Sequence, residues 1–184
     1  MIGVTGTTGA RLVRRLTERG APHRLIVRDA GRAPTGPGEV VDFGGYGDPA
    51  GMRRAFDGVW TLFLCSAHEA QDRVEQHRSA VDAAIAAGVA RIVYLSFVGA
   101  ARDATFTFAR DHFLTEEHIR SSGIDFTFSR QNLYMDLLPL IAGSDDVIRG
   151  PAGKGRVAPV LRDDVADRSP CWSPKTGTRD TPTP

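Results

Sequence analysis

The 184-residue chain contains 41% hydrophobic and 24% charged residues, a composition typical of a soluble globular domain with a sizeable core. Disorder over the whole chain is therefore excluded. The formal net charge is only +1, so the chain as a whole does not attract nucleic acid or an acidic membrane, and an anion must be bound by local groups. We expect a small molecule as the partner, and neither nucleic acid nor a membrane.

The cysteines, Cys65 and Cys171, have neither metal-ligand nor redox spacing, which predicts reduced thiols. No apolar run is long enough to cross a bilayer, and the first residues lack the pattern of a signal peptide. These observations predict a cytoplasmic protein.

Short apolar runs alternate with amphipathic helical patterns along the chain, and they predict strands at residues 2–5, 24–28, 39–43, 59–65, 91–96 and 124–129. A helix is predicted from the first glycine-rich turn to Gly20, with Leu12, Val13 and Leu16 on its apolar face. Further helices are expected at residues 49–58, with Asp48 as N-cap, at 72–87, with the apolar face Val74, Val81, Ala84 and Ile85, and at 107–122. Residues 29–39 contain too many glycines and prolines for a helix.

This alternation predicts an α/β fold with a doubly wound, mostly parallel, Rossmann-like sheet that helices cover on both faces. We expect one domain over residues 1–166. Residues 167–184 have no periodicity and contain four prolines, so we expect a disordered or non-native tail.

A glycine-rich turn lies between the first predicted strand and the first predicted helix. Its glycines fit either a Gly3, Gly6 and Gly9 register or one in which Gly6 and Gly9 are the first two glycines and the third is lost. We favour the second, because the first leaves only Met1 and Ile2 for the strand. At the start of an α/β series such a turn predicts a dinucleotide site at Gly6, Thr7, Thr8 and Gly9, since the helix directs free N–H groups at a pyrophosphate. The alternative is an ordinary strand-to-helix turn.

The chain resembles the NmrA-like, atypical short-chain dehydrogenase/reductase family, including its NAD(P)H-dependent quinone oxidoreductases. The resemblance rests on motifs spread over most of the chain: Val-Thr-Gly-Thr-Thr-Gly at residues 4–9, Val-Arg-Asp at 27–29, Glu-Gln-His-Arg-Ser at 75–79, Ala-Ala-Gly-Val at 86–89, Tyr-Leu-Ser at 94–96, Thr-Glu-Glu-His-Ile-Arg-Ser-Ser-Gly at 115–123 and Arg-Asp-Asp-Val-Ala at 162–166. It implies that residues 1–166 form an NAD(P)-binding domain. In similar proteins about three more residues follow the second glycine, and a small substrate lobe follows the Asp-Val-Ala element. The resemblance therefore implies a shortened phosphate loop and a largely missing lobe.

Arg28 ends the second predicted strand, where a guanidinium suits a 2′-phosphate, so NADP(H) is favoured over NAD(H). Two alternatives remain open: Asp29 could bind the ribose instead, and Arg28 could be a solvated surface residue. By resemblance Asp42 lies near the adenine, or it is a plain turn residue at the end of a strand.

Further cofactor contacts are expected where strands end at the carboxyl edge of the sheet. These positions are Ser66, Ala67 and Ser96, whose alternative role is to give room for turns. The resemblance adds Asn132 and Tyr134 near the nicotinamide, although Tyr134 could instead pack in the core.

In many relatives a Tyr-x-x-x-Lys pair donates a proton and holds the ribose, and Phe108 and His112 stand at the matching positions. Phe108 has no proton to donate. His112 is therefore the candidate catalytic residue, although a surface histidine is the alternative.

Two histidine–carboxylate pairs have helical spacing that could suit a metal: His112 with Glu116, and His68 with Asp72. Neither has a third ligand at suitable spacing, and Glu116 with Arg120 is more simply an ion pair, so no metal is expected.

These residues support an NAD(P)H-dependent reductase of a quinone-like or other small acceptor. The alternatives are a redox sensor that binds NAD(P) and a protein partner without catalysis, and an inactive truncated product.

Overall fold

The computed structural model describes residues 1–68, 70–149 and 153–168. The strands are β1 (Arg24–Val27), β2 (Glu39–Asp42), β3 (Thr61–Leu64), β4 (Arg91–Phe97) and β5 (Asp125–Gln131). The helices are α1 (Thr7–Glu18), α2 (Pro49–Ala55), α3 (Arg73–Ala86), α4 (Thr107–Ser121), α5 (Leu138–Ile141) and α6 (Arg162–Arg168), with the short 3-10 turns η1 (Ala30–Arg32) and η2 (Met135–Leu137). Within these ranges no helix is long and apolar enough to cross a membrane.

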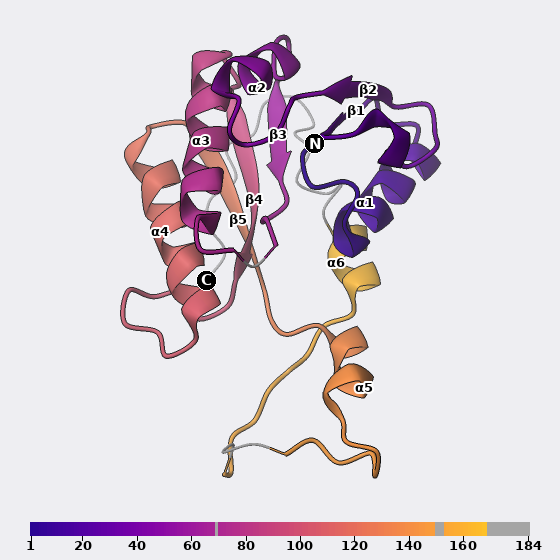
Figure 1. Ribbon diagram of the computed structural model, residues 1–184, viewed down its shortest axis with the longest axis vertical. Helices are drawn as coiled ribbons and strands as arrows, with labels where there is room; N and C mark the ends of the chain where they lie inside the picture. The colour runs from indigo at the N-terminus through magenta and orange to yellow at the C-terminus, as the bar shows by residue number, and fades with distance from the viewer. Residues whose placement is uncertain (69, 150–152, 169–184) are drawn as a thin grey trace.

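All the paired strands run parallel, as the sequence predicts, and they form a two-stranded part, β1-β2, and a three-stranded part, β3-β4-β5. Ile2 connects the two parts, because it bridges Ile26 of β1 on one side and Leu64 of β3 on the other. The spatial order is therefore β2, β1, Ile2, β3, β4, β5, the order of a doubly wound dinucleotide-binding sheet. Figure 1 shows the N-terminus between the two parts.

The predicted first strand at residues 2–5 was wrong in extent, because only Ile2 takes part in the sheet. The chain leaves the sheet at Gly3, whose φ of +79° suits glycine, and α1 already begins at Thr7. A Cβ atom on Gly9 would lie 2.2 Å from the carbonyl oxygen of Gly3, so helix and turn pack together here as closely as glycine allows. The Gly3, Gly6 and Gly9 register is therefore the correct one, and the register that we favoured from the sequence was wrong.

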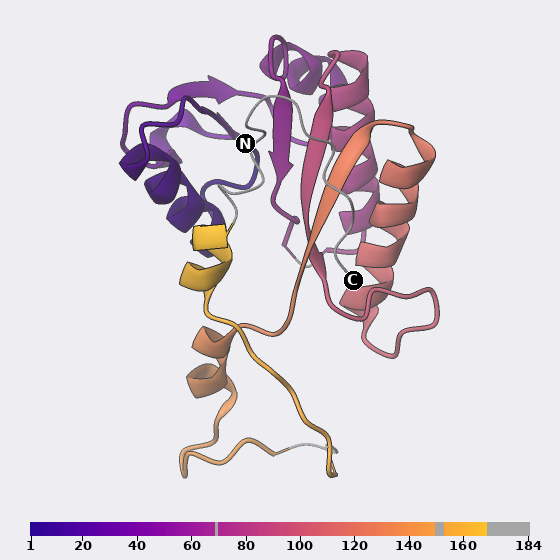
Figure 2. The ribbon, with the colours of Figure 1, turned by 180° about the vertical axis from the view of Figure 1, so that it is seen from behind.

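Helices cover both faces of the sheet, as predicted for a doubly wound fold (Figures 1 and 2). Alternate residues of β1, β3 and β4 enter two separate cores, because successive side chains of a strand point to opposite faces. On one face Ile26, Leu64 and Tyr94 pack with apolar residues of α2, α3 and α4. On the other, Leu25 and Phe63 pack with apolar residues of α1 and α6.

The buried face of α3 matches the predicted one only in part, because Val81 and Ala84 are buried as predicted and the other two residues are not. Ile85 is 40% exposed and Val74 is only partly buried. The buried positions include the polar residues Arg73 and His77 together with small apolar ones, Ala80, Val81, Ala83 and Ala84. Hydrophobicity alone found the C-terminal half of the buried face and missed its start, because the polar side chains of Arg73 and His77 occupy it.

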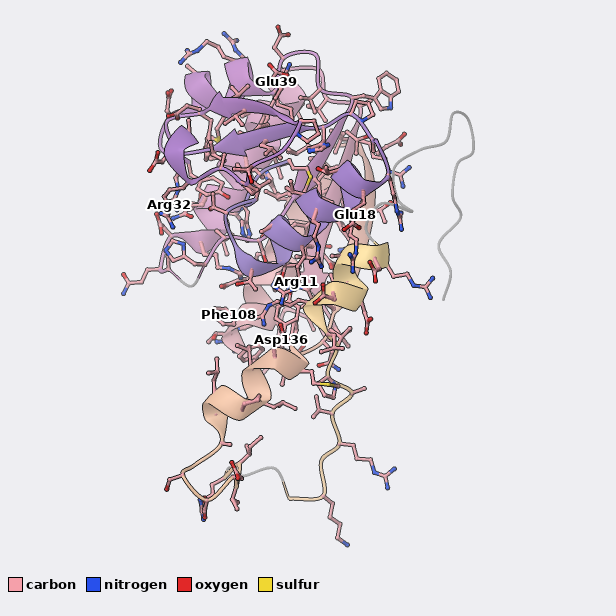
Figure 3. The ribbon with its side chains drawn as sticks, turned by 90° about the vertical axis from the view of Figure 1, so that its right-hand side faces the viewer. Arg11, Glu18, Arg32, Glu39, Phe108 and Asp136 are labelled. Atoms are coloured by element: carbon pink, nitrogen blue, oxygen red, sulfur yellow. The ribbon has the colours of Figure 1, made fainter. Side chains whose placement is uncertain are left out.

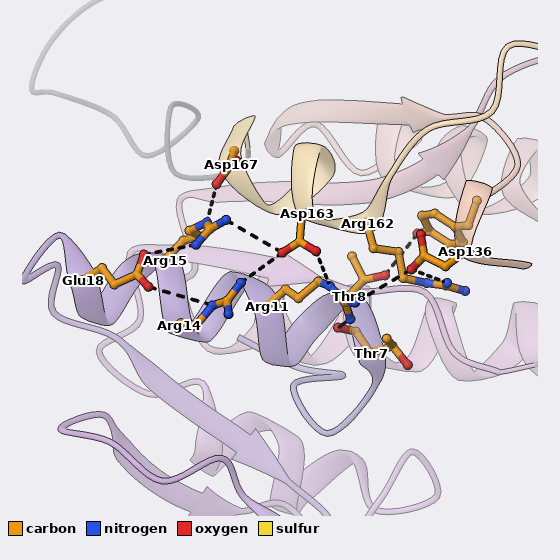
Figure 4. Close-up of polar contacts among 11 residues, drawn as sticks. Thr7, Thr8, Arg11, Arg14, Arg15, Glu18, Asp136, Arg162, Asp163 and Asp167 are labelled. Atoms are coloured by element: carbon orange, nitrogen blue, oxygen red, sulfur yellow. Dashed lines mark hydrogen bonds and ion pairs between the residues drawn. The ribbon is translucent and has the colours of Figure 1, made fainter.

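The C-terminal helix α6 packs on α1 through a cluster of charges (Figure 4). Arg11 Nε and Arg14 Nη2 each donate to Asp163 at 3.0 Å, and Arg15 pairs with Asp167. Between β5 and α6 the chain leaves the body of the protein through α5 and returns (Figures 1 and 2). Asp167 and Arg168 thus belong to α6, while the rest of the predicted tail, with Cys171, lies outside the described residues.

We predict that Gly9→Ala lowers the free energy of unfolding by about 2 kcal/mol, because the added methyl group would overlap the backbone of Gly3 and overpack the turn. Gly47→Ala is the matched control, since no atom lies within 4 Å of its added Cβ. Denaturant unfolding of both variants measures the difference. Equal midpoints for the two would contradict the close packing of α1 on the turn.

Candidate functional site

A cavity of about 530 Å³ opens at the carboxyl ends of the parallel strands. Its walls come from the glycine turn at the start of α1, the segment after β3, the start of α4, the segment after β5, and α6. In Figure 3 Phe108 and Asp136 lie on the lower side of the main body, above α5, and Glu39, at the start of β2, lies near the top. Open parallel sheets bind their ligands at this edge.

The first turn of α1 lines the cavity with the residues predicted for phosphate binding, Gly6, Thr7, Thr8 and Gly9. Gly6 is the N-cap and has no side chain to cap the helix, and the first turn contains no acidic residue. The first N–H groups of a helix lack intrahelical acceptors, and together with the helix dipole they attract an anion. None of the described residues that line the cavity is acidic, whereas Arg73 and Arg162 both line it.

Five further residues predicted as site residues also line the cavity: Ser66, Ala67, His112, Asn132 and Tyr134. Tyr134 connects three elements, because Thr8 of α1 donates to its hydroxyl at 3.3 Å and the guanidinium of Arg162 in α6 lies 4.0 Å from its ring centre. Arg162 also pairs with Asp136 at 2.9 Å (Figure 4). Burial raises the pKa of Tyr134 to about 12, so its phenol is protonated at neutral pH.

Three predicted contacts do not line the cavity. Ser96 is fully buried and donates to Glu116 Oε1 at 2.6 Å, so the expectation that it faces a ligand was wrong. Asp42 accepts a hydrogen bond from the backbone N–H of Gly44 at 2.8 Å, as expected for a turn residue at the end of a strand, the alternative considered above. Arg28 is exposed after β1, and its guanidinium makes no hydrogen bond or ion pair with any described residue.

His112 lies in a buried polar network rather than on the helix surface, and it is only 4% exposed. Arg73 Nη2 lies 3.1 Å from its Nε2, and because arginine can only donate, His112 Nε2 accepts. The proton of the neutral ring is therefore on Nδ1, which lies 2.8 Å from the Tyr94 hydroxyl. Burial, reinforced by the charge of Arg73, lowers the pKa of His112 to about 3. The expectation that His112 donates a proton near neutral pH therefore does not fit its surroundings.

Arg73 organises this wall, although no role was predicted for it from the sequence. It is 4% exposed, donates through Nε to the carbonyl of Ala67 at 2.9 Å, and pairs with Asp111 at 3.2 Å. Its guanidinium also lies 5.1 Å from the ring centre of Phe108. The available signal for this role was that Arg73 and His77 are four residues apart, on the same helix face as a run of small residues. A prediction of the buried face from apolar residues alone does not detect it.

Glu116 is not available to a metal ion. Its buried carboxylate accepts hydrogen bonds from Ser96, Arg120 and Arg130 at 2.6 to 2.9 Å, which confirms the expected pair with Arg120. These donors hold the pKa of Glu116 down although burial raises it. The described residues contain no group of three or more metal-ligating side chains.

A family model described as NAD(P)H-binding matches residues 3–168. The chain belongs to the NmrA-like, atypical short-chain dehydrogenase/reductase family. It is 33% identical over 176 residues to quinone oxidoreductase 2 of Escherichia coli K12, a match that covers 90% of this chain and 61% of the relative. The NAD(P)H azoreductase of Xenophilus azovorans is 29% identical, over 90% of this chain and 59% of that protein.

Solved structures of this family have the same fold. The triphenylmethane reductase of Citrobacter sp., complexed with NADP(H), matches with a TM-score of 0.84 at 30% identity, over 96% of this chain and 65% of that one. The Escherichia coli NADPH-dependent quinone oxidoreductase complexed with NADPH matches with a TM-score of 0.82 at 31% identity, over 94% of this chain and 64% of that one. The chain thus spans about three fifths of the length of the curated relatives it matches.

We predict that stability falls as the pH is lowered below about 6.5, because the pKa values of both His77 and His112 are lowered in the folded protein, mainly by burial. The unfolded chain then takes up protons that the folded chain does not, which costs up to about 1.4 kcal/mol per pH unit for each histidine. Denaturant unfolding from about pH 7.5 to 5 measures this slope. His112→Gln should make it shallower, and an unchanged slope would show that His112 is charged in the folded state.

Proposed function

We propose that this chain is an NAD(P)H-dependent oxidoreductase that reduces a quinone-like or other small acceptor. The observation that carries the proposal is the cavity at the carboxyl edge, where an uncapped glycine turn meets an aromatic wall and where none of the described lining residues is acidic. This arrangement suits a pyrophosphate at one end and a planar ring at the other. The quinone oxidoreductase and azoreductase relatives support the reaction class.

The residues fit a dinucleotide in two places. The free N–H groups at the start of α1 can hold the pyrophosphate, and Arg28, exposed at the end of β1 without an ion-pair partner among the described residues, can pair with a 2′-phosphate. NADP(H) is therefore favoured over NAD(H). The cofactor, when bound, supplies the hydride.

The protein then binds and orients the two reactants and limits access of water. Ser66, Ala67, Asn132 and Tyr134 form the walls beside the turn. Phe108 offers no proton, and neutral His112 directs its Nδ1 at Tyr94, so we assign the protonation of the reduced acceptor to water. A quinone tolerates this arrangement because it accepts hydride without prior protonation.

A second candidate is a sensor that binds NAD(P) and passes its redox state to a protein partner. Phe108 favours this candidate, because it lines the cavity at the position where many relatives have a proton-donating tyrosine. Fluorescence titration with NADPH and NADH, followed by absorbance of the reduced cofactor with a panel of quinones, separates the two. Binding without oxidation supports the sensor, and no binding contradicts both.

We predict that Arg28→Ala raises the dissociation constant for NADPH about tenfold and leaves that for NADH nearly unchanged, because a charge-assisted pair with the 2′-phosphate is lost. Arg54→Ala is the matched control: it removes the same charge from an exposed position on α2. Isothermal titration with both nucleotides measures the effect. Equal weakening of NADPH and NADH would show that Arg28 does not read the phosphate.

A further inference from the structure

The backbone of Ala67, at the wall of the cavity, is held on both sides by side chains of α3. Its N–H donates to His77 Nε2 at 2.9 Å, and its carbonyl oxygen accepts from Arg73 Nε at 2.9 Å. Arg73 and His77 are four residues apart, so they lie on the same face of the helix. One face of α3 thus provides hydrogen-bond partners for both the N–H and the carbonyl of Ala67. These two bonds fix the backbone of the turn after β3.

His77 can accept this hydrogen bond only in one protonation state. Its Nε2 must be unprotonated to receive the N–H of Ala67, so the ring proton is on Nδ1, which lies 2.9 Å from Thr115 Oγ1. The Thr115 hydroxyl in turn donates to the carbonyl of Asp111 at 2.9 Å, which leaves its oxygen to accept from His77. The fully buried His77 is therefore held in orientation by α4 as well as α3.

Arg73 links the same turn to the opposite part of the wall. Its three nitrogens contact the Ala67 carbonyl, Asp111 and His112, so the guanidinium connects the segment after β3 with the start of α4. Both segments line the cavity on either side of Arg73. The spacing between these two walls thus depends on Arg73, which is positioned by α3.

We propose that His77 and Arg73 are positioning residues that set the affinity for the dinucleotide by clamping Ala67. This inference rests on the proposed function, because Ser66 and Ala67 are the part of the wall assigned to the cofactor. Arg73 lines the cavity itself, whereas His77 does not, so the effect of His77 reaches the cofactor only through the backbone of the turn. Without these hydrogen bonds the turn is more mobile, and the free energy needed to order it on binding lowers the affinity for the cofactor.

The test compares two substitutions of one residue. His77→Gln can return a carbonyl oxygen to the place of Nε2, whereas His77→Asn reaches only the place of Nδ1 and leaves the N–H of Ala67 without an acceptor. Both remove the imidazole and its edge contact with Tyr94, so both should lose similar thermal stability. Binding of NADPH and hydrogen exchange of the Ala67 amide are measured on the whole chain at a temperature where both variants are folded.

We expect His77→Asn to accelerate exchange at Ala67 and to weaken NADPH binding about tenfold, and His77→Gln to stay close to the unmodified protein in both. Equal loss of affinity in the two variants, or faster exchange without loss of affinity, would overturn the proposal. If the unmodified chain binds no NADPH, the proposed function fails, while the exchange data still report whether the clamp exists.

Thr115→Val is an independent variant that leaves His77 in place. It tests the same proposal if the His77 variants do not fold. It removes the nearer acceptor for the Nδ1 proton and leaves only the Tyr94 hydroxyl, at 3.3 Å, so the ring is held less firmly. We expect faster exchange at Ala67 and a rise in KM for NADPH at unchanged kcat where turnover is measurable. A fall in kcat at unchanged KM would contradict a role in holding the cofactor.

Discussion

The sheet depends on one residue at its centre. Ile2 is the only residue of the expected first strand that bridges both neighbouring strands, and its N–H and carbonyl groups bond to Phe63 and Cys65. The chain must leave the sheet directly afterwards, because Gly9 of α1 packs against the carbonyl of Gly3 with no space for a side chain. A short strand and a close helix are thus two results of the same constraint, and together they place the start of α1 at the edge of the cavity.

The polar network behind the cavity wall combines the cationic guanidinium of Arg73 with two buried imidazoles, those of His77 and His112. Buried Arg73 is compensated by Asp111, by the Ala67 carbonyl and by the ring of Phe108. Its charge adds to the effect of burial in keeping His77 and His112 unprotonated. The wall therefore offers positive charge and fixed hydrogen-bond geometry to an anionic ligand, and His112, kept neutral by burial, is not a proton source at neutral pH.

The last described helix completes the site from the far end of the chain. Arg11, Arg14 and Arg15 of α1 pair with Asp163 and Asp167 of α6. This contact brings Arg162 onto the ring of Tyr134, whose hydroxyl meets Thr8 at the first turn of α1. Segments more than a hundred residues apart are thus joined at one end of the cavity.

The sequence by itself determined the α/β alternation, the parallel sheet and the family, because hydrophobic periodicity and the glycine turn are local patterns. It also identified Thr8, Ala67 and Tyr134 as cavity residues, since strand ends and the first turn of α1 meet at one edge. Only the tertiary structure decided the register of the glycines, the burial of Ser96 against Glu116, and the role of Arg73. Each of these depends on contacts between different segments of the folded chain. Residue type and spacing along one segment do not contain that information.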